Sequence, residues 1–288
     1  GINAEYGEMI GTLVLQTYPI VIMHGILNNK DKMRWAEQAL HEMYPEAYIL
    51  NMEIGDGIID SQRIPLVDQV HEFAVKVKDD KRLQNGFVAL CHSQGSLICR
   101  SYLQKYNNPP MKRLVTTAGP HAGYYCGNIT KCPIIGNFPH LMERIDNFMY
   151  SERGQDFFTP SQFWRSPYNL DLYRQHSSFM ADLNNELVVN ETYKKNLQSL
   201  EMFAMVGAKK DDIIRPWDAS LFNFFKDGTE EVEQMRSRSV YKDLGLDELD
   251  RQGKLVQVVS EDFDHHDFWM ESGQEWLMEN AYIYLQKE

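Results

Sequence analysis

The stretch GFVALCHSQGSLICRSYLQKY, residues 86–106, joins a short apolar run to a helical pattern at one serine. Residues 86–91 are typical of a buried strand, and residues 96–106 carry apolar side chains at the spacing of a helix packed on a sheet. Ser93 therefore lies at the turn, either as a nucleophile above the sheet or as a helix cap. Ser96 is better placed than Ser93 to cap the helix, which favours the nucleophile.

The residues around this serine fit a tight strand-to-helix turn, with one departure. Gly95 follows Ser93 by two positions, as in the pattern G-x-S-x-G, but Cys91 replaces the first glycine. Small residues are needed there because strand and helix pass closely. A helix that begins at the turn also offers free backbone N–H groups and the positive end of its dipole.

Strand and helix patterns alternate on both sides of the turn. The predicted strands are residues 18–25, 47–52, 86–91, 113–119, 201–207 and 254–260, all expected to be buried on both faces. The predicted helices include residues 31–45 and 65–80. This alternation indicates an α/β fold with a mainly parallel central sheet flanked by helices, in one domain over residues 1–288.

Residues 124–200 interrupt the alternation. They contain no clear strand, and they carry many large apolar side chains: Phe138, Met142, Phe148, Met149, Phe157, Phe158, Phe163, Trp164, Phe179 and Met180. We interpret this part as a helical, lid-like insertion over the carboxyl end of the sheet. These side chains form either the insertion's own small core or, in part, an apolar channel for a long acyl chain.

A nucleophilic serine on such a turn requires partners at the ends of other strands. Gly25 and Ile26 follow an early strand, and the backbone N–H groups of Ile26 and Gln94 are the expected oxyanion donors. Acidic residues at 211–212 follow a later strand, and histidines at 265–266 follow the last one. The order serine, aspartate, histidine is that of the α/β-hydrolase fold.

Composition narrows the class of function. The formal net charge is −12, with 29 Lys and Arg against 41 Asp and Glu, which argues against nucleic acid as a partner. No apolar run is long enough to span a bilayer, and the N-terminus lacks the layout of a signal peptide, as expected of a mature secreted form. No residue pattern demands a metal or an organic cofactor.

Cysteines and sequons bear on the compartment. Cys126 and Cys132 lie in a segment typical of a loop, where a short disulfide is favoured over a metal site or free thiols. Cys91 and Cys99 either pair or are two small buried residues. Asn128 and Asn190 begin Asn-x-Thr triplets that are glycosylated only in the secretory pathway. An oxidising compartment is therefore expected.

Several longer stretches, IVIMHGI, SQGSLICR, FWRSPYNLDLYRQHSSFMADLNNE, NETYKKNL and DDIIRPWDASLFNFF among them, resemble the palmitoyl-protein thioesterases, a family of lysosomal α/β-hydrolases. The resemblance spans nearly the whole chain and is closer to the second branch of the family. It implies that Ser93, Asp211 and His265 are the catalytic residues, with His266 as the rival histidine. It also implies a disulfide between Cys91 and Cys99 and a glycan in the stretch at Asn190.

The expected function is hydrolysis of long-chain fatty-acyl thioesters, carried by protein cysteine or by coenzyme A, through an acyl-enzyme on Ser93. A lipase or carboxylesterase would share the same residues and differ in the leaving group. A non-catalytic binding protein of this fold would be expected to lack a triad member, and all three are present. We expect a monomer in the lysosome or outside the cell.

Overall fold

The computed structural model describes residues 17–127, 132 and 142–287. Six parallel strands form the central sheet in the order β2-β1-β3-β4-β5-β8. Their bounds are Ile20–Met23 (β1), Ile49–Met52 (β2), Phe87–His92 (β3), Met111–Thr117 (β4), Met202–Ala208 (β5) and Leu255–Ser260 (β8). The fold class and the six strands predicted from the sequence are confirmed.

The two outermost strands differ from the prediction that every strand is buried on both faces. β1 and β3 are fully buried, whereas β2 is half-buried in its middle and β8 is buried only at Ser260. These two strands lie at the edges of the sheet, where one side of each strand has no neighbour. Apolar runs alone do not distinguish an edge strand from a central one.

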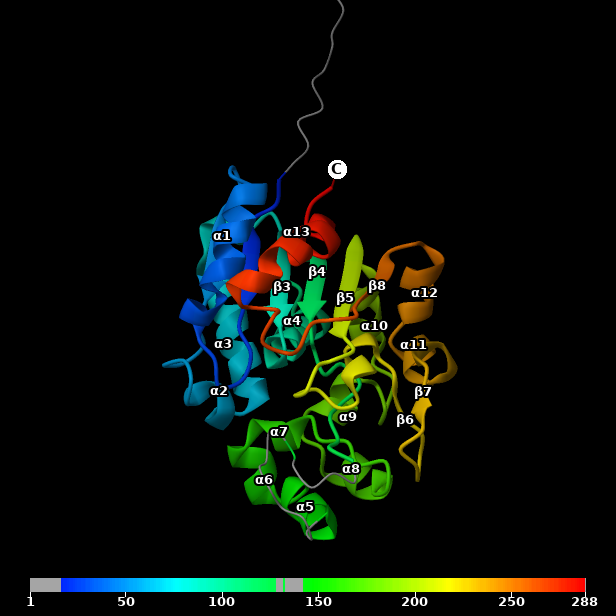
Figure 1. Cartoon of the computed structure of the whole chain (residues 1–288). Coiled ribbons are helices and arrows are strands. Elements are labelled where there is room, and N and C mark those ends of the chain that lie inside the picture. The colour runs from blue at the N-terminus through cyan, green and yellow to red at the C-terminus, as the bar shows by residue number, and fades with distance from the viewer. Residues whose placement is uncertain (1–16, 128–131, 133–141, 288) are drawn as a thin grey trace, which may run out of the picture.

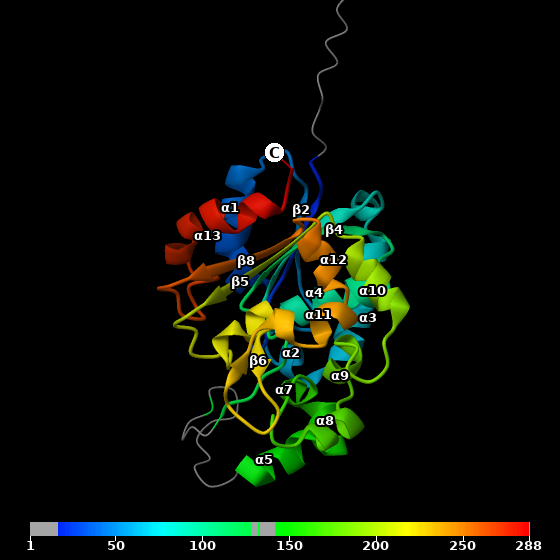
Figure 2. The same cartoon turned by 90° about the vertical axis from the view of Figure 1, so that its right-hand side faces the viewer.

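Helices cover both faces of the sheet (Figure 2). On one face lie α1 and α13, and on the other α3, α4 and α10, with α11 and α12 beside them. Their bounds are Arg34–Met43 (α1), Leu66–Asp79 (α3), Gln94–Lys105 (α4), Glu191–Gln198 (α10), Val240–Asp243 (α11), Leu246–Arg251 (α12) and Gln274–Asn280 (α13). The central helix α4 is buried over nearly its whole length because α3 and α10 pack against it.

A group of short helices follows β4 and lies at the end of the molecule away from the C-terminus (Figures 1 and 2). It consists of α5 (Met142–Met149), α6 (Glu152–Phe157), α7 (Thr159–Gln162), α8 (Leu170–His176) and α9 (Met180–Leu183). Residues 124–200 thus supply both this group and α10, which packs against α4 in the helical layer.

Five of the large apolar side chains of this insertion are buried: Met149, Phe163, Trp164, Phe179 and Met180. They belong to the same continuous core as the strands of the sheet, and Phe158 is partly buried against that core. Phe148 and Phe157 are exposed by 46% and 69%. Phe138 lies outside the described residues. The buried side chains of the insertion therefore contribute to the core that the whole domain shares.

Two disulfides link the four cysteines, Cys91 with Cys99 and Cys126 with Cys132. The first joins the end of β3 to α4. Asn190 caps α10 through its side-chain oxygen, which accepts from the backbone N–H groups of Thr192 and Tyr193. The other sequon residue, Asn128, lies outside the described residues.

Candidate active site

Ser93 occupies a strained turn between β3 and α4. Its backbone has φ 51° and ψ −125°, and no capping hydrogen bond from its side chain is present. The backbone N–H of Ser93 donates to the carbonyl of Thr117 at 2.8 Å, which anchors the turn to β4. The hydroxyl of Ser96 is engaged instead with the carbonyl of Cys91. A non-glycine residue in this conformation is costly and is commonly found at functional sites.

Glycines allow the turn to approach β1 closely. A Cβ atom at Gly95 would lie 2.7 Å from the carbonyl oxygen of Met23 and would also collide with the carbonyl of His24. A Cβ atom at Gly25 would lie 2.9 Å from the Cβ of Ser93. The loop after β1 therefore passes directly beside the serine.

Asp211 and His265 form a buried pair at the ends of β5 and β8. The Nδ1 atom of His265 lies 2.9 Å from Oδ2 and 3.1 Å from Oδ1 of Asp211. The backbone N–H groups of Ile213 and Ile214 donate to Oδ1 of Asp211 at 2.9 and 2.8 Å. The turn thus fixes the carboxylate, and the carboxylate orients the imidazole.

The rival histidine has a different environment. The side chain of His266 is 55% exposed, and its Nδ1 lies 3.7 Å from the carboxylate of Asp264. The side chain of His265 is 9% exposed. Of the two histidines, the structure brings His265 against Asp211.

A cavity of about 190 Å³ brings Ser93 and His265 together. The loop after β1 and the loop after β8 form its walls, and its lining is Gly25, Ile26, Leu27, Asn28, His92, Ser93, Ile213, His265, His266 and Trp269. Within the described part of the chain, no hydrogen bond joins Ser93 to His265. Such bonds are often long in free enzymes and tighten when substrate binds.

The two expected oxyanion donors flank the serine. Ile26 lines the cavity, and Gln94 is the first residue of α4, so its backbone N–H has no acceptor within the helix. The side chain of His24 holds the loop before Ile26, with Nδ1 2.9 Å from the carbonyl of Gly25 and Nε2 2.7 Å from Glu53.

A buried polar network surrounds the side chain of Gln94, and no pattern in the sequence indicates it. The amide of Gln94 donates to the carbonyl of Ser61 at 2.6 Å, and its oxygen accepts from the hydroxyl of Thr159 at 2.7 Å. Ser61 lies on α2 (Asp60–Arg63) and Thr159 on α7 of the insertion. The insertion is therefore linked directly to the residue that follows the serine.

His92 is a second residue that sequence reasoning did not find. Its ring packs against that of His265 with centroids 4.9 Å apart, and its Nδ1 lies 3.0 Å from the hydroxyl of Thr117. Burial lowers the pKa of His92 well below its ordinary value, and the neighbouring His265 lowers it further. A neutral ring therefore lies behind the paired histidine. The sequence feature that could have identified His92 is its position directly before Ser93.

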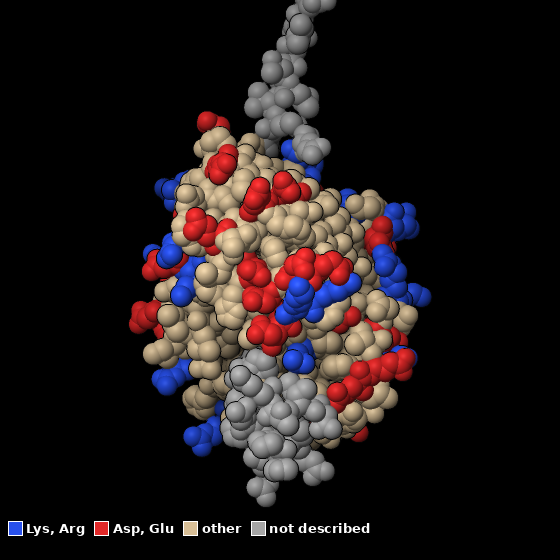
Figure 3. Space-filling model, in the orientation of Figure 1, with Lys and Arg blue, Asp and Glu red and all other residues tan. Residues whose placement is uncertain are grey.

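Acidic and basic side chains are interspersed over the face seen in Figure 3, where basic groups lie beside acidic ones. Among the described residues, no group of histidine, cysteine, aspartate or glutamate side chains is arranged to hold a metal ion. The helices in the described ranges are all too short or too polar to cross a membrane.

Comparison with known proteins places these features in a family. The family model described as palmitoyl protein thioesterase matches residues 19–265. Palmitoyl-protein thioesterase 3 of Dictyostelium discoideum is 34% identical, over 84% of this chain and 83% of that protein. Palmitoyl-protein thioesterase 1 of Caenorhabditis elegans is 31% identical, over 86% of both chains. Lysosomal thioesterase PPT2 of Bos taurus is 30% identical, over 86% of this chain and 81% of that protein.

Solved structures show the same fold at low sequence identity. An extracellular α/β-hydrolase from a Paenibacillus species matches with a TM-score of 0.50 at 13% identity, over 94% of this chain and 100% of that one. The propeptide form of the lipase BlEst2 of Bacillus licheniformis matches with a TM-score of 0.51 at 13% identity, over 94% of this chain and 51% of that one.

Proposed function

The chain belongs to the palmitoyl protein thioesterase family, and from this premise we propose that it is a serine thioesterase that hydrolyses long-chain fatty-acyl thioesters. The observation that carries the proposal is the buried pair of Asp211 and His265 facing the cavity in which Ser93 occupies the strained turn. The nucleophile and the base thus line one cavity, and the group that orients the base lies directly behind the base.

In the first step, Nε2 of His265 takes the hydroxyl proton of Ser93 while the serine oxygen bonds to the thioester carbonyl carbon. The carbonyl electron pair moves to oxygen, and the backbone N–H groups of Ile26 and Gln94 stabilise that charge. Each donor is worth roughly 3 kcal/mol in measured oxyanion holes. When the intermediate collapses, the carbon–sulfur bond breaks, the thiolate takes the proton from His265, and an acyl-Ser93 ester remains.

In the second step, His265 takes a proton from water, and the resulting hydroxide attacks the acyl ester. The ester bond breaks, the proton passes to the oxygen of Ser93, and the fatty acid leaves. In both steps Asp211 orients the ring of His265 and stabilises its imidazolium form. The group of helices α5 to α9 acts as the lid over this site, and Thr159 connects it to Gln94.

The secretory pathway and the lysosome are the proposed location. Two disulfides are typical of proteins from oxidising compartments. Relatives such as the bovine protein carry the name lysosomal thioesterase.

The test compares a palmitoyl-cysteine peptide, palmitoyl-CoA and a matched oxyester, each with wild type and with Ser93→Ala. We expect both thioesters or one of them to be cleaved faster than the oxyester, with turnover lost in Ser93→Ala and the melting temperature unchanged. Faster cleavage of the oxyester would indicate an esterase instead. Turnover retained in Ser93→Ala would exclude the serine mechanism.

A further inference from the structure

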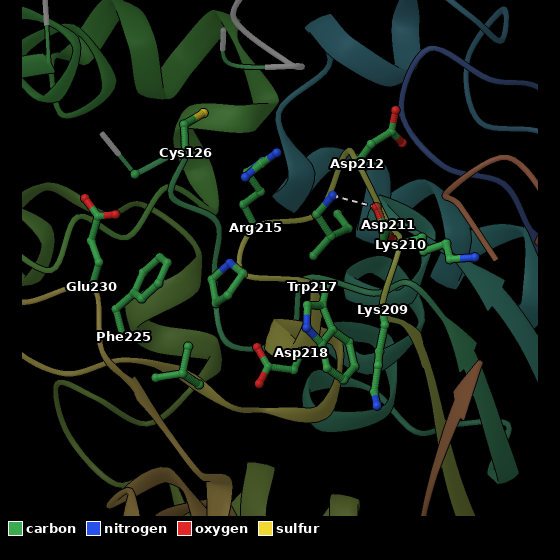
Figure 4. Close-up of a pocket in the computed structure, with 14 residues that line it drawn as sticks. Cys126, Lys209, Lys210, Asp211, Asp212, Arg215, Trp217, Asp218, Phe225 and Glu230 are labelled. Atoms are coloured by element: carbon green, nitrogen blue, oxygen red, sulfur yellow. Dashed lines mark hydrogen bonds between the residues drawn. The ribbon is translucent and has the colours of Figure 1, made fainter. Parts of the chain in front are cut away.

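A second cavity, of about 450 Å³, lies beside the candidate active site (Figure 4). The turn after β5 separates the two: Ile213 lines the cavity of Ser93, whereas Asp211, Asp212 and Ile214 line the second one. The second cavity is large enough for a small ligand, whose sites usually span about 300–1,000 Å³. The mechanism above does not use it.

Two buried polar atoms among the lining residues lack partners. Within the described residues, neither Oδ1 of Asp218 nor Nε of Arg215 has a hydrogen-bond partner. Asp218 is only 8% exposed, and its other oxygen accepts from the side chain of Asn223 at 3.2 Å. In Figure 4, Arg215 extends toward the end near Cys126 and Asp212, and Asp218 lies at the other end beside Trp217. An unpaired acceptor and an unpaired donor favour a ligand with the complementary groups.

The lining also has an apolar part, made of Ile214, Pro216, Trp217, Phe225 and Val232. The two lysines at the cavity already have partners, since Lys209 pairs with Glu261 at 2.8 Å and Lys210 with Asp262 at 2.7 Å. Besides these lysines, the lining holds this apolar part, the carboxylates of Asp211, Asp212 and Glu230, and one buried acceptor and one buried donor that are unpaired. A polypeptide segment offers the matching groups: an amide N–H, a carbonyl oxygen and an apolar side chain.

The second cavity and the Ser93 cavity adjoin at the turn after β5. In the proposed mechanism the oxyanion faces Ile26 and Gln94, and the thiolate must face His265 to receive its proton. The carboxylate of Asp211 faces Nδ1 of His265, on the opposite edge of the ring, so the link between the cavities is the turn itself: Ile213 lines the Ser93 cavity and Ile214 the second one. The part of the substrate beyond the sulfur reaches the second cavity by passing over this turn.

We propose that this second cavity binds the polypeptide segment next to the acylated cysteine of a protein substrate. The inference rests on the proposed function, because that function sets which part of the substrate lies on the His265 side. An amide N–H of the segment donates to Asp218, a carbonyl oxygen accepts from Nε of Arg215, and an apolar side chain packs on Trp217 and Phe225.

The charge of the lining disfavours coenzyme A, the other thiol that commonly carries acyl groups. Four carboxylates line the cavity, those of Asp211, Asp212, Asp218 and Glu230, against three basic side chains, Lys209, Lys210 and Arg215. The phosphates of coenzyme A would meet this excess of negative charge, whereas an uncharged peptide would not. The cavity therefore favours protein over coenzyme A as the acyl carrier.

The experiment compares two substrates that differ only in the part beyond the thioester. One is a palmitoyl-cysteine peptide with residues on both sides of the cysteine, and the other is S-palmitoyl-N-acetylcysteamine. Asp218→Asn is the test variant, because the amide keeps the size of the carboxylate and an oxygen for Asn223 while presenting a donor to the cavity. Asp79→Asn is the matched control, because Asp79 is exposed at the end of α3 and outside the lining.

We expect kcat/KM of Asp218→Asn to fall about tenfold for the peptide and to stay unchanged for the small thioester, since one hydrogen bond to a charged group is lost. Asp79→Asn should behave as wild type on both. Equal losses on both substrates, or no loss on either, would overturn the proposal. Turnover that survives in Ser93→Ala would instead overturn the serine mechanism.

Binding of the deacylated cysteine peptide tests the same cavity without turnover. Isothermal titration should give a Kd about tenfold weaker for Asp218→Asn than for wild type and for Asp79→Asn. A peptide that binds the two variants equally, or that does not bind wild type, would also overturn the proposal.

Discussion

Replacing Thr159 with valine removes one hydroxyl and keeps the shape of the side chain. That hydroxyl donates to the side-chain oxygen of Gln94 at 2.7 Å, and both residues are at most 1% exposed. In Thr159→Val the oxygen of Gln94 loses the described donor while remaining buried. A buried acceptor left unsatisfied costs about 1–3 kcal/mol of unfolding free energy.

The size of the expected change in melting temperature follows from the length of the chain. For domains of roughly this size, 1 kcal/mol corresponds to about 2–4 °C. Thr159→Val should therefore melt about 2–12 °C below wild type. Activity should fall as well, because the side chain of Gln94 is then held mainly by the carbonyl of Ser61 and its backbone N–H is less well placed.

The assay measures kcat and KM on a palmitoyl thioester together with thermal unfolding. We expect kcat to fall several-fold, up to the roughly 10²-fold loss seen when an oxyanion donor is removed, with little change in KM. Thr159→Ser is the matched control, since it restores the hydroxyl and should recover both stability and kcat. If Thr159→Val matched wild type, or if Thr159→Ser were as impaired, the link between the insertion and Gln94 would be refuted.

Three further predictions concern the turn, the disulfide and the buried histidines. Gly95→Ala should lower the unfolding free energy by more than about 3 kcal/mol, because the added carbon meets backbone atoms. Gly228→Ala is the control: it has open space around it and should cost about 1 kcal/mol. Similar denaturant midpoints for the two variants would contradict this prediction. Cys99→Ala should lower the unfolding free energy by about 2.5 kcal/mol, as expected for the short loop that its disulfide closes, and an unchanged midpoint would show that the bond does not form. Burial lowers the pKa of His92 and His121, so below about pH 6.5 the unfolded chain takes up protons that the folded chain does not. The two histidines therefore contribute their full stabilisation above that pH. The stabilisation is lost as the pH falls, by up to about 1.4 kcal/mol per pH unit for each histidine. A melting temperature that does not change between pH 7 and 5.5 would contradict this prediction.

The central sheet was predictable because parallel strands buried on both faces produce unbroken apolar runs between helical patterns. The runs at Ile20–Met23 and Phe87–His92 are fully buried strands in the structure. Edge position depends on which strands pair, and pairing is set by long-range contacts that a local pattern does not contain. The hairpin of β6 (Phe224–Phe225) and β7 (Val232–Glu233) was missed because each strand has only two residues.

The candidate site was predictable in part for a different reason. Its main residues follow the carboxyl ends of successive strands, so chain order alone brings them to one edge of the sheet. The choice of His265 over His266 depends on the direction of each side chain, which chain order does not determine. In the sequence, only the resemblance to the family favoured His265. Contacts such as those of Thr159 with Gln94 join residues far apart in the chain, and no local pattern indicates them.

The most direct test of the account is to find where the acyl group resides during turnover. Wild-type protein is mixed with a palmitoyl thioester, quenched in acid within the first turnovers, digested and analysed by mass spectrometry. The account predicts a palmitoyl group on the peptide that contains Ser93, present in wild type and absent from Ser93→Ala. Turnover with no acylated peptide at any time, or a palmitoyl group on a different residue, would contradict it.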